Sequence, residues 1–156
     1  MSDPKTAVAL TLQHEGGFVN NPADPGGATN MGVTQKDIPS IDIRNLTVPQ
    51  ATDYYLENFW KPFYSQIESQ LVANKIFDLG VLFGIGTTVK ILQGVLKLTQ
   101  DGVFGEQTLA AVNGAEVSSL LLAFRTALVQ HAVAIGAAKP SERQFVGGWI
   151  RRINGR

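Results

Sequence analysis

This chain of 156 residues contains no cysteine, and its acidic and basic side chains balance at 13 each. Without cysteine there is no disulfide framework and no thiol nucleophile, which excludes small disulfide-stabilised folds and thiol chemistry. A formal charge of zero gives no electrostatic reason to expect nucleic acid or an anionic membrane as a partner. His14 and His131 are the only two histidines and there is no cysteine, too few ligands to indicate a zinc site, so we expect no metal and no cofactor.

Long hydrophobic runs are scarce as well. The longest uncharged stretches, 79–89 and 126–138, are shorter than the ~20 residues that cross a bilayer, so we expect no membrane insertion. The first residues lack a basic region followed by an apolar segment, so the sequence predicts no signal peptide. A hydrophobic share of 44% with 17% charged residues is typical of a compact globular unit with one well-buried core.

Apolar periodicity and capping residues predict a mainly α-helical fold. We expect helices over about 4–14, 47–59 and 70–83, a helix capped by Thr87 or Thr88, a short helix from 106, a central buried helix over about 116–135, and a last helix from 141. Residues 17–34 are the only plausible place for strands, as a small irregular β-hairpin after the first helix.

Two carboxylates, Glu15 and Asp24, stand nine positions apart in a glycine- and proline-rich segment. Val8, Leu12 and Glu15 share one helix face, so Glu15 is predicted to emerge at the edge of the core. The negative end of the helix dipole and partial burial both favour its protonated form, whereas Asp24, in a loop rich in backbone amides, is expected to stay ionised. Two carboxyl groups driven in opposite directions indicate an acid and an anion, an arrangement that hydrolytic sites often have.

The segment also carries a family resemblance. Glu15-Gly-Gly-Phe, Asp24-Pro-Gly-Gly and Thr29-Asn-Met-Gly-Val-Thr are similar to motifs of the glycoside hydrolase family 108 lysozymes, a group of N-acetylmuramidases that includes phage endolysins and bacterial secretion activator proteins. The likeness continues through Tyr55 to Trp60-Lys-Pro, Phe77-Asp78, Leu92-Gln93, Asp101-Gly-Val-Phe-Gly with Thr108, and Gly148-Trp149 with Arg152. It therefore spans nearly the whole chain.

The resemblance implies a two-lobed, lysozyme-like helical fold with a catalytic region over 1–90 and a helical, peptidoglycan-binding region over 91–156, packed as one compact unit. It implies that Glu15 is the catalytic acid, with Asp24 in the place of the aspartate of phage-type lysozymes. The threonine position of those enzymes falls on Asn30, with Thr29 one residue earlier, so we predict a catalytic role for Thr29 and a substrate-binding role for Asn30. Tyr54 and Tyr55 are predicted to line the cleft, because aromatic faces stack on sugars.

The function implied is hydrolysis of the β-1,4 bond between N-acetylmuramic acid and N-acetylglucosamine in peptidoglycan strands. Two alternatives stay open: a non-catalytic peptidoglycan-binding or secretion-accessory protein, and a lytic transglycosylase, which uses one glutamate and leaves anhydro ends. We expect a protein made in the cytoplasm, delivered by a holin or another export system, and acting in the periplasm or cell wall of a Gram-negative bacterium.

Overall fold

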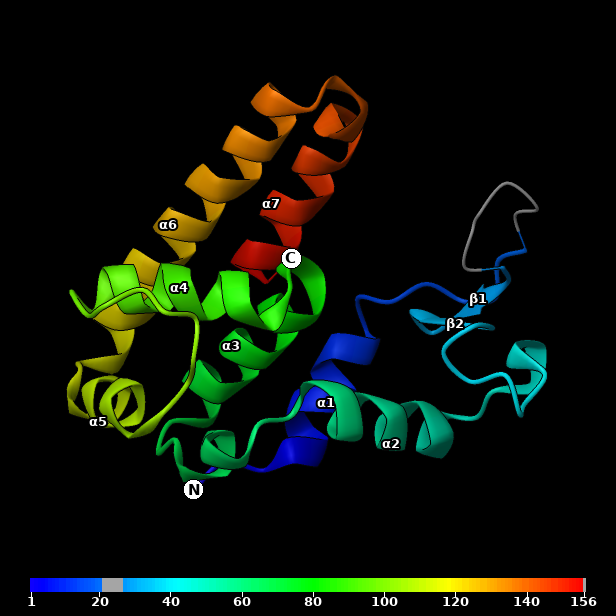
Figure 1. Cartoon of the computed structure of the whole chain (residues 1–156), viewed down its shortest axis with the longest axis horizontal. Helices are drawn as coiled ribbons and strands as arrows, with labels where there is room; N and C mark the ends of the chain where they lie inside the picture. The colour runs from blue at the N-terminus through cyan, green and yellow to red at the C-terminus, as the bar shows by residue number, and fades with distance from the viewer. Residues whose placement is uncertain (21–26, 156) are drawn as a thin grey trace.

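A computed structural model describes residues 1–20 and 27–155. The described chain is mainly α-helical, with one tiny two-stranded antiparallel sheet beside the first helices (Figure 1). In chain order its elements are α1 (Pro4–Leu12), β1 (Thr29–Asn30), β2 (Val33–Thr34), η1 (Ile43–Asn45), α2 (Val48–Phe59), η2 (Pro62–Gln66), α3 (Gln70–Phe83), α4 (Ile85–Val95), α5 (Glu106–Gly114), α6 (Val117–Ala138), η3 (Pro140–Phe145) and α7 (Val146–Asn154). The predicted lysozyme-like helical fold is confirmed.

Helix α1 begins as the sequence predicts and ends earlier. The Asp3 carboxylate accepts hydrogen bonds from the amides of Lys5 and Thr6 and caps the helix, and Pro4 stands in its first turn. The last helical residue is Leu12, two residues before the predicted end at His14. The His14 amide donates to the Thr11 carbonyl at 2.9 Å. This bond spans three residues, as in a 3₁₀ turn, so the α-helical pattern of bonds spanning four residues ends here. Glu15 therefore stands three residues beyond the last residue of α1, outside the helix.

Helices α2 and α3 confirm the local signals. Thr47 and Gln50 form the predicted capping box at the start of α2, and α3 has the predicted bounds. The expected cap at Thr87 or Thr88 is wrong. Gly84, with φ +87°, ends α3 and is itself the cap residue of α4, and the buried Thr88 hydroxyl donates to the Leu79 carbonyl at 2.8 Å. Glycine adopts this φ at little cost, so the chain turns here within a single residue.

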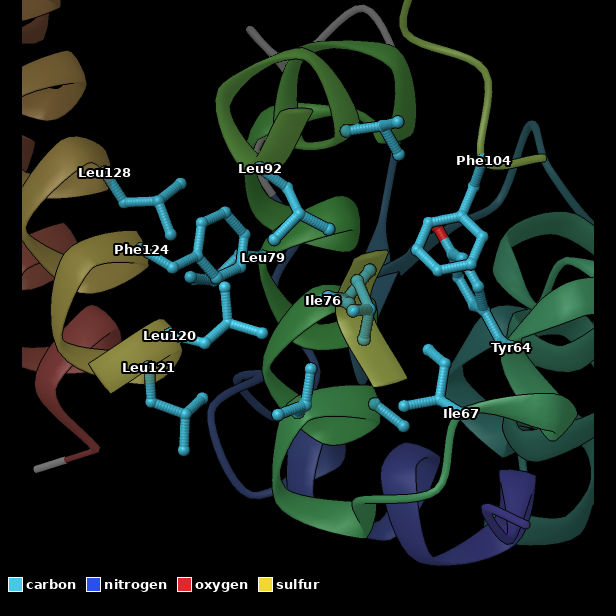
Figure 2. Packing of buried hydrophobic residues seen from close by; sticks show 14 of the residues in the cluster. Tyr64, Ile67, Ile76, Leu79, Leu92, Phe104, Leu120, Leu121, Phe124 and Leu128 are labelled. Carbon is cyan, nitrogen blue, oxygen red and sulfur yellow. The ribbon is translucent and has the colours of Figure 1, made fainter. Parts of the chain in front are cut away.

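Two clusters of buried apolar residues stabilise the fold. In the larger, side chains of α6 such as Leu120, Phe124 and Leu128 face Leu79 of α3 and Leu92 of α4 (Figure 2). The smaller cluster joins α1, α2, the sheet and Phe77 of α3. Fully burying one such side chain stabilises the fold by about 1.5–3 kcal/mol. Helix α3 contributes to both clusters and so connects the two lobes.

Helix α6 differs from the predicted central buried helix. It projects from the body of the molecule with α7 running back alongside it (Figure 1). Only 28% of the most apolar 18-residue stretch of α6 is buried, and the Leu122 side chain is 69% exposed. Within the described part of the chain it is the single helix long and apolar enough to cross a bilayer, by length and composition alone. The uncharged stretch 126–138 covers only part of this helix because Arg125 interrupts it, and the expectation of no membrane insertion stays a prediction.

Residue 90, the predicted division between the two regions, lies inside α4. The larger cluster draws on α3 before this point and on α6 after it. The division into two regions at residue 90 stays a prediction. The larger apolar cluster contains residues from both sides of that position.

Candidate active site

Glu15 lines a pocket of about 190 Å³ between the two lobes. The other lining residues come from the sheet turn, α2, α3 and α7: Gly32, Tyr54, Tyr55, Phe59, Val81, Leu82 and Arg152. The Glu15 side chain is 16% exposed, so its carboxyl group is largely enclosed and still open to the pocket. We call this the Glu15 pocket. Among the residues that line it, Glu15 alone carries a carboxylate.

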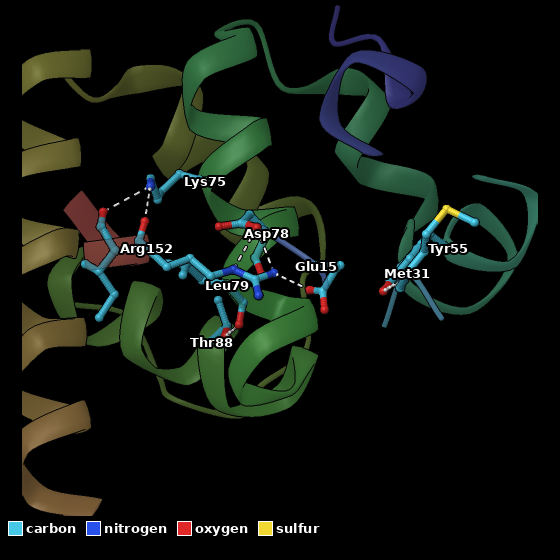
Figure 3. A network of polar contacts seen from close by, with 9 residues as sticks. Glu15, Met31, Tyr55, Lys75, Asp78, Leu79, Thr88 and Arg152 are labelled. Atoms are coloured by element: carbon cyan, nitrogen blue, oxygen red, sulfur yellow. Dashed lines mark hydrogen bonds and ion pairs between the residues drawn. The ribbon is translucent and has the colours of Figure 1, made fainter. Parts of the chain in front are cut away.

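Arg152 of α7 connects Glu15 to Asp78 of α3 (Figure 3). Its Nη2 lies 2.8 Å from Glu15 Oε1 and 2.9 Å from Asp78 Oδ1, and its Nε donates to the same Oδ1 at 3.1 Å. Burial alone lowers the pKa of Arg152, but the Asp78 and Glu15 carboxylates outweigh it and raise that pKa above its usual value. Arg152 is thus anchored mainly on Asp78, by two hydrogen bonds to its carboxylate, and Nη2 also faces Glu15.

Lys75 fixes the end of α7 against α3. Its Nζ donates to the Ile153 carbonyl at 3.0 Å, and a longer contact of 3.5 Å reaches the Arg152 carbonyl. A cation at these carbonyls satisfies groups that the helix end leaves unpaired. Burial lowers the Lys75 pKa, although the Asp78 carboxylate acts in the opposite direction. The backbone that carries Arg152 is therefore held on the same helix that carries Asp78.

The turn between β1 and β2 closes the other side of the acid. Gly32 has φ +74°, and a Cβ there would lie 2.5 Å from Glu15 Oε2 and closer still to the Tyr55 hydroxyl. The Tyr55 hydroxyl donates to the Met31 carbonyl at 3.0 Å and so holds this turn against α2 (Figure 3). Burial, with the Glu15 charge beside it, raises the Tyr55 pKa, which keeps this hydroxyl a donor. Only glycine fits where the turn meets the carboxylate.

The structure brings together three of the predicted site residues, Glu15, Tyr54 and Tyr55. Tyr55 is 1% exposed, so its ring packs in the core and its hydroxyl supports the turn. Tyr54 is partly buried, and burial together with the Asp37 carboxylate raises its pKa. Tyr54 thus offers a neutral ring and hydroxyl at the pocket wall. The substrate-binding roles of both tyrosines stay predictions.

The other predicted site residues lie away from the lining of this pocket or outside the described residues. Thr29 exchanges backbone hydrogen bonds with Val19 at 2.7 and 2.8 Å. The Asn30 side chain is buried and donates to the Ile43 carbonyl at 3.0 Å, so its amide supports the loop after the sheet. Asp24 lies outside the described residues, and its role stays a prediction.

Sequence reasoning missed Arg152, Asp78 and Gly32 as parts of the site. Arg152 and Asp78 appeared only as members of the family pattern, with no role, and the contact of Arg152 with Glu15 joins opposite ends of the chain. The helix-dipole argument for Glu15 did not include this cation. Gly32 left a local signal, a glycine in the middle of a predicted hairpin turn.

Within residues 1–20 and 27–155, no group of three or more histidine, aspartate or glutamate side chains is placed to hold a metal ion. The chemistry offered by the described site is that of one enclosed carboxyl group beside a guanidinium and two tyrosine hydroxyls. A carboxyl group in such a pocket can donate a proton to an oxygen of a bound ligand.

Comparison with known proteins shows the family to which the chain belongs. The glycosyl hydrolase 108 family profile matches residues 8–84, and a profile described as "Predicted Peptidoglycan domain" matches residues 87–154. The solved structure of SagA from Brucella abortus is similar to this one, with a TM-score of 0.77 and 31% sequence identity over 97% of this chain and 89% of that chain. No curated protein matches the sequence. The chain therefore belongs to the glycosyl hydrolase 108 family, with a peptidoglycan-binding domain at its C-terminal end.

Proposed function

We propose that this protein is a peptidoglycan hydrolase that cleaves the β-1,4 bond between N-acetylmuramic acid and N-acetylglucosamine, with Glu15 as general acid. One observation carries the proposal: Glu15 is the single carboxylate lining the pocket between the lobes, in the region that matches a glycosyl hydrolase family. A peptidoglycan-binding domain in the same chain supports the polymer as substrate.

In the proposed reaction, the bound sugar takes the place of the Arg152 contact, and Glu15 in its protonated form donates its proton to the glycosidic oxygen as the sugar develops oxocarbenium character. Asp24 stabilises that charge or orients the attacking water, with help from Thr29. Arg152 and the Gly32 turn hold Glu15 from two sides, so its rotamer is fixed before substrate arrives. Arg152 makes two hydrogen bonds to the Asp78 carboxylate and one contact with Glu15. A bound sugar can therefore replace the contact with Glu15 while Asp78 keeps the guanidinium in place.

The contact with Arg152 also favours a second candidate, a non-catalytic peptidoglycan-binding protein. An acid paired with a guanidinium resembles a structural ion pair, and such a pair alone does not indicate catalysis. Under either candidate the partner is peptidoglycan. We propose that the protein acts on peptidoglycan in the periplasm or cell wall of a Gram-negative bacterium, and that it crosses the inner membrane through a holin or another export system.

The test compares the clearing of purified sacculi by wild type, Glu15→Gln and the matched control Glu68→Gln, an exposed glutamate outside the pocket lining. We expect wild type and Glu68→Gln to clear at the same rate and Glu15→Gln to be slower by at least a hundredfold, as expected for loss of a general acid. If wild type binds sacculi without clearing them, the non-catalytic candidate replaces the hydrolase.

A further inference from the structure

A second hollow lies beside the Glu15 pocket, on α7. Leu82 and Arg152 line both. The second hollow has a volume of about 350 Å³, and its other lining residues are His14, Gly148, Trp149 and Arg151. We call it the α7 pocket. A chain of sugars that reaches Glu15 can therefore extend past Leu82 and Arg152 towards α7.

Arg151 lines the α7 pocket and can form an ion pair with a ligand there. It is exposed, and among residues 1–20 and 27–155 no carboxylate lies within ion-pair distance of it. Arg152, its neighbour, is already committed to Asp78 and Glu15. Cβ atoms at Gly147 and Gly148 would lie 3.7 and 3.8 Å from the two terminal nitrogens of Arg151, so its guanidinium runs alongside the bare backbone of these glycines.

Trp149 gives the same pocket an aromatic wall. Its ring stacks on Phe145, with centroids 6.3 Å apart, and meets the Phe83 ring edge-on at 5.8 Å. These contacts fix the orientation of the indole. An ordered aromatic ring beside a cation suits a ligand that combines a sugar face with a negative charge.

A third hollow has the reverse charge. It shares Tyr54 with the Glu15 pocket, and its lining includes Asp37, Asp53 and Glu57. A carboxylate on the substrate is repelled at that end and attracted at the α7 end. The two ends therefore define one direction in which an anionic glycan can lie across Glu15.

We propose that the α7 pocket binds a carboxylate of the peptidoglycan strand through Arg151, so that Arg151 determines specificity for muramyl-containing glycans over uncharged ones. This inference rests on the proposed function, because it assigns a subsite for that same substrate. In native sacculi the lactyl carboxyl group of N-acetylmuramic acid is an amide wherever a stem is attached, so the carboxylate that meets Arg151 there belongs to the peptide stem. Where the stem has been removed, the lactyl group presents the same carboxylate to a guanidinium.

The experiment measures binding, so that it does not depend on catalysis. Cosedimentation with sacculi is measured for four proteins in a Glu15→Gln background: the parent, Arg151→Gln, Arg151→Lys, and the control Lys139→Gln, which removes an exposed charge outside both pockets. Three substrates are compared: native sacculi, sacculi whose carboxylates are amidated with carbodiimide and methylamine, and strands stripped of their stems by an amidase, which exposes the lactyl carboxylate.

We expect Arg151→Gln to weaken binding to native sacculi about fivefold, as one exposed charge-assisted contact would. Arg151→Lys should recover most of that loss, Lys139→Gln should show none, and amidated sacculi should bind the parent and Arg151→Gln equally. Stripped strands carry the lactyl carboxylate alone, so an Arg151→Gln loss that persists on them would show that Arg151 accepts either carboxylate. No loss on stripped strands would show that Arg151 requires a stem carboxylate. An equal loss on native and amidated sacculi, or no loss on either, would overturn the inference.

The proposed function fails separately, if the wild-type protein with Glu15 intact releases no fragments from the native sacculi. That result leaves the binding comparison of Arg151→Gln readable.

Discussion

Replacing Arg152 with methionine tests the ion-pair network at the centre of the site. Methionine keeps much of the side-chain length and removes the guanidinium that joins Asp78 to Glu15. The Asp78 side chain is 8% exposed, so the substitution leaves a nearly buried carboxylate without its ion-pair partner. Breaking a buried pair from one side costs about 3–5 kcal/mol.

The lower end of that range applies here because Lys75 also acts on Asp78 and partly replaces the lost charge. A loss of about 3 kcal/mol is a large part of the roughly 5–15 kcal/mol by which folded proteins are stable. For a urea dependence of about 2 kcal/mol per molar, the unfolding midpoint would fall by about 1.5 M. Urea denaturation followed by circular dichroism measures this shift.

Two further variants separate charge from packing. Arg152→Met with Asp78→Asn removes the stranded carboxylate, and we expect it to recover about 1–2 kcal/mol of the loss. Arg143→Met removes an exposed arginine outside the network and should change stability by less than about 0.5 kcal/mol. The reasoning is refuted if Arg152→Met loses less than about 1 kcal/mol, or if the double variant is no more stable than Arg152→Met alone.

The remaining predictions concern the turn beside the acid and one helix cap. Gly32→Ala should slow peptidoglycan hydrolysis at least tenfold and lower the unfolding midpoint, because its Cβ would collide with Glu15. The control Gly86→Ala should change neither, because its Cβ has no atom within 4 Å. Tyr55→Phe should cost about 1 kcal/mol in urea denaturation and lower kcat more than it raises KM, and an unchanged kcat would contradict its positioning role. Glu116 caps the start of α6. The Ser118 backbone amide, followed by the Ser118 hydroxyl, donates hydrogen bonds that lower the Glu116 pKa to about 2. The stabilisation by the Glu116 charge is therefore complete above pH about 4.5 and is lost as the pH falls towards 2. A Glu116→Gln variant should therefore melt below wild type at neutral pH and together with it near pH 2, and a constant difference in Tm across that range would contradict the assignment.

The parts of the fold that the sequence predicts well rest on local chemistry. The Thr47 and Gln50 capping box and the bounds of α3 depend on residues within a few positions of one another. The same local reasoning fails at Gly84, because the Thr88 hydroxyl bonds to the preceding helix instead of capping its own. Apolar residues around α6 suggested a buried helix, and periodicity alone could not show that only one face has neighbours to pack against.

For the site, the sequence indicated Glu15 and the hairpin but not what holds them. Glu15 was identified from its family motif and its place at the end of a helix. Its partners Arg152 and Asp78 come from distant segments, and only the packing of α7 on α3 brings them together. Tyr54 and Tyr55 were predicted alike as neighbours, yet α2 turns Tyr55 into the core and leaves Tyr54 at the pocket wall.

Mass spectrometry of the ends of muropeptides released by wild type and Glu15→Gln tests the central claim most directly. The account predicts that wild type alone releases fragments and that they carry N-acetylmuramic acid ends reducible by borohydride. Anhydro ends would show a transglycosylase, and equal release by Glu15→Gln would show that Glu15 is not the acid. Either result would contradict the account.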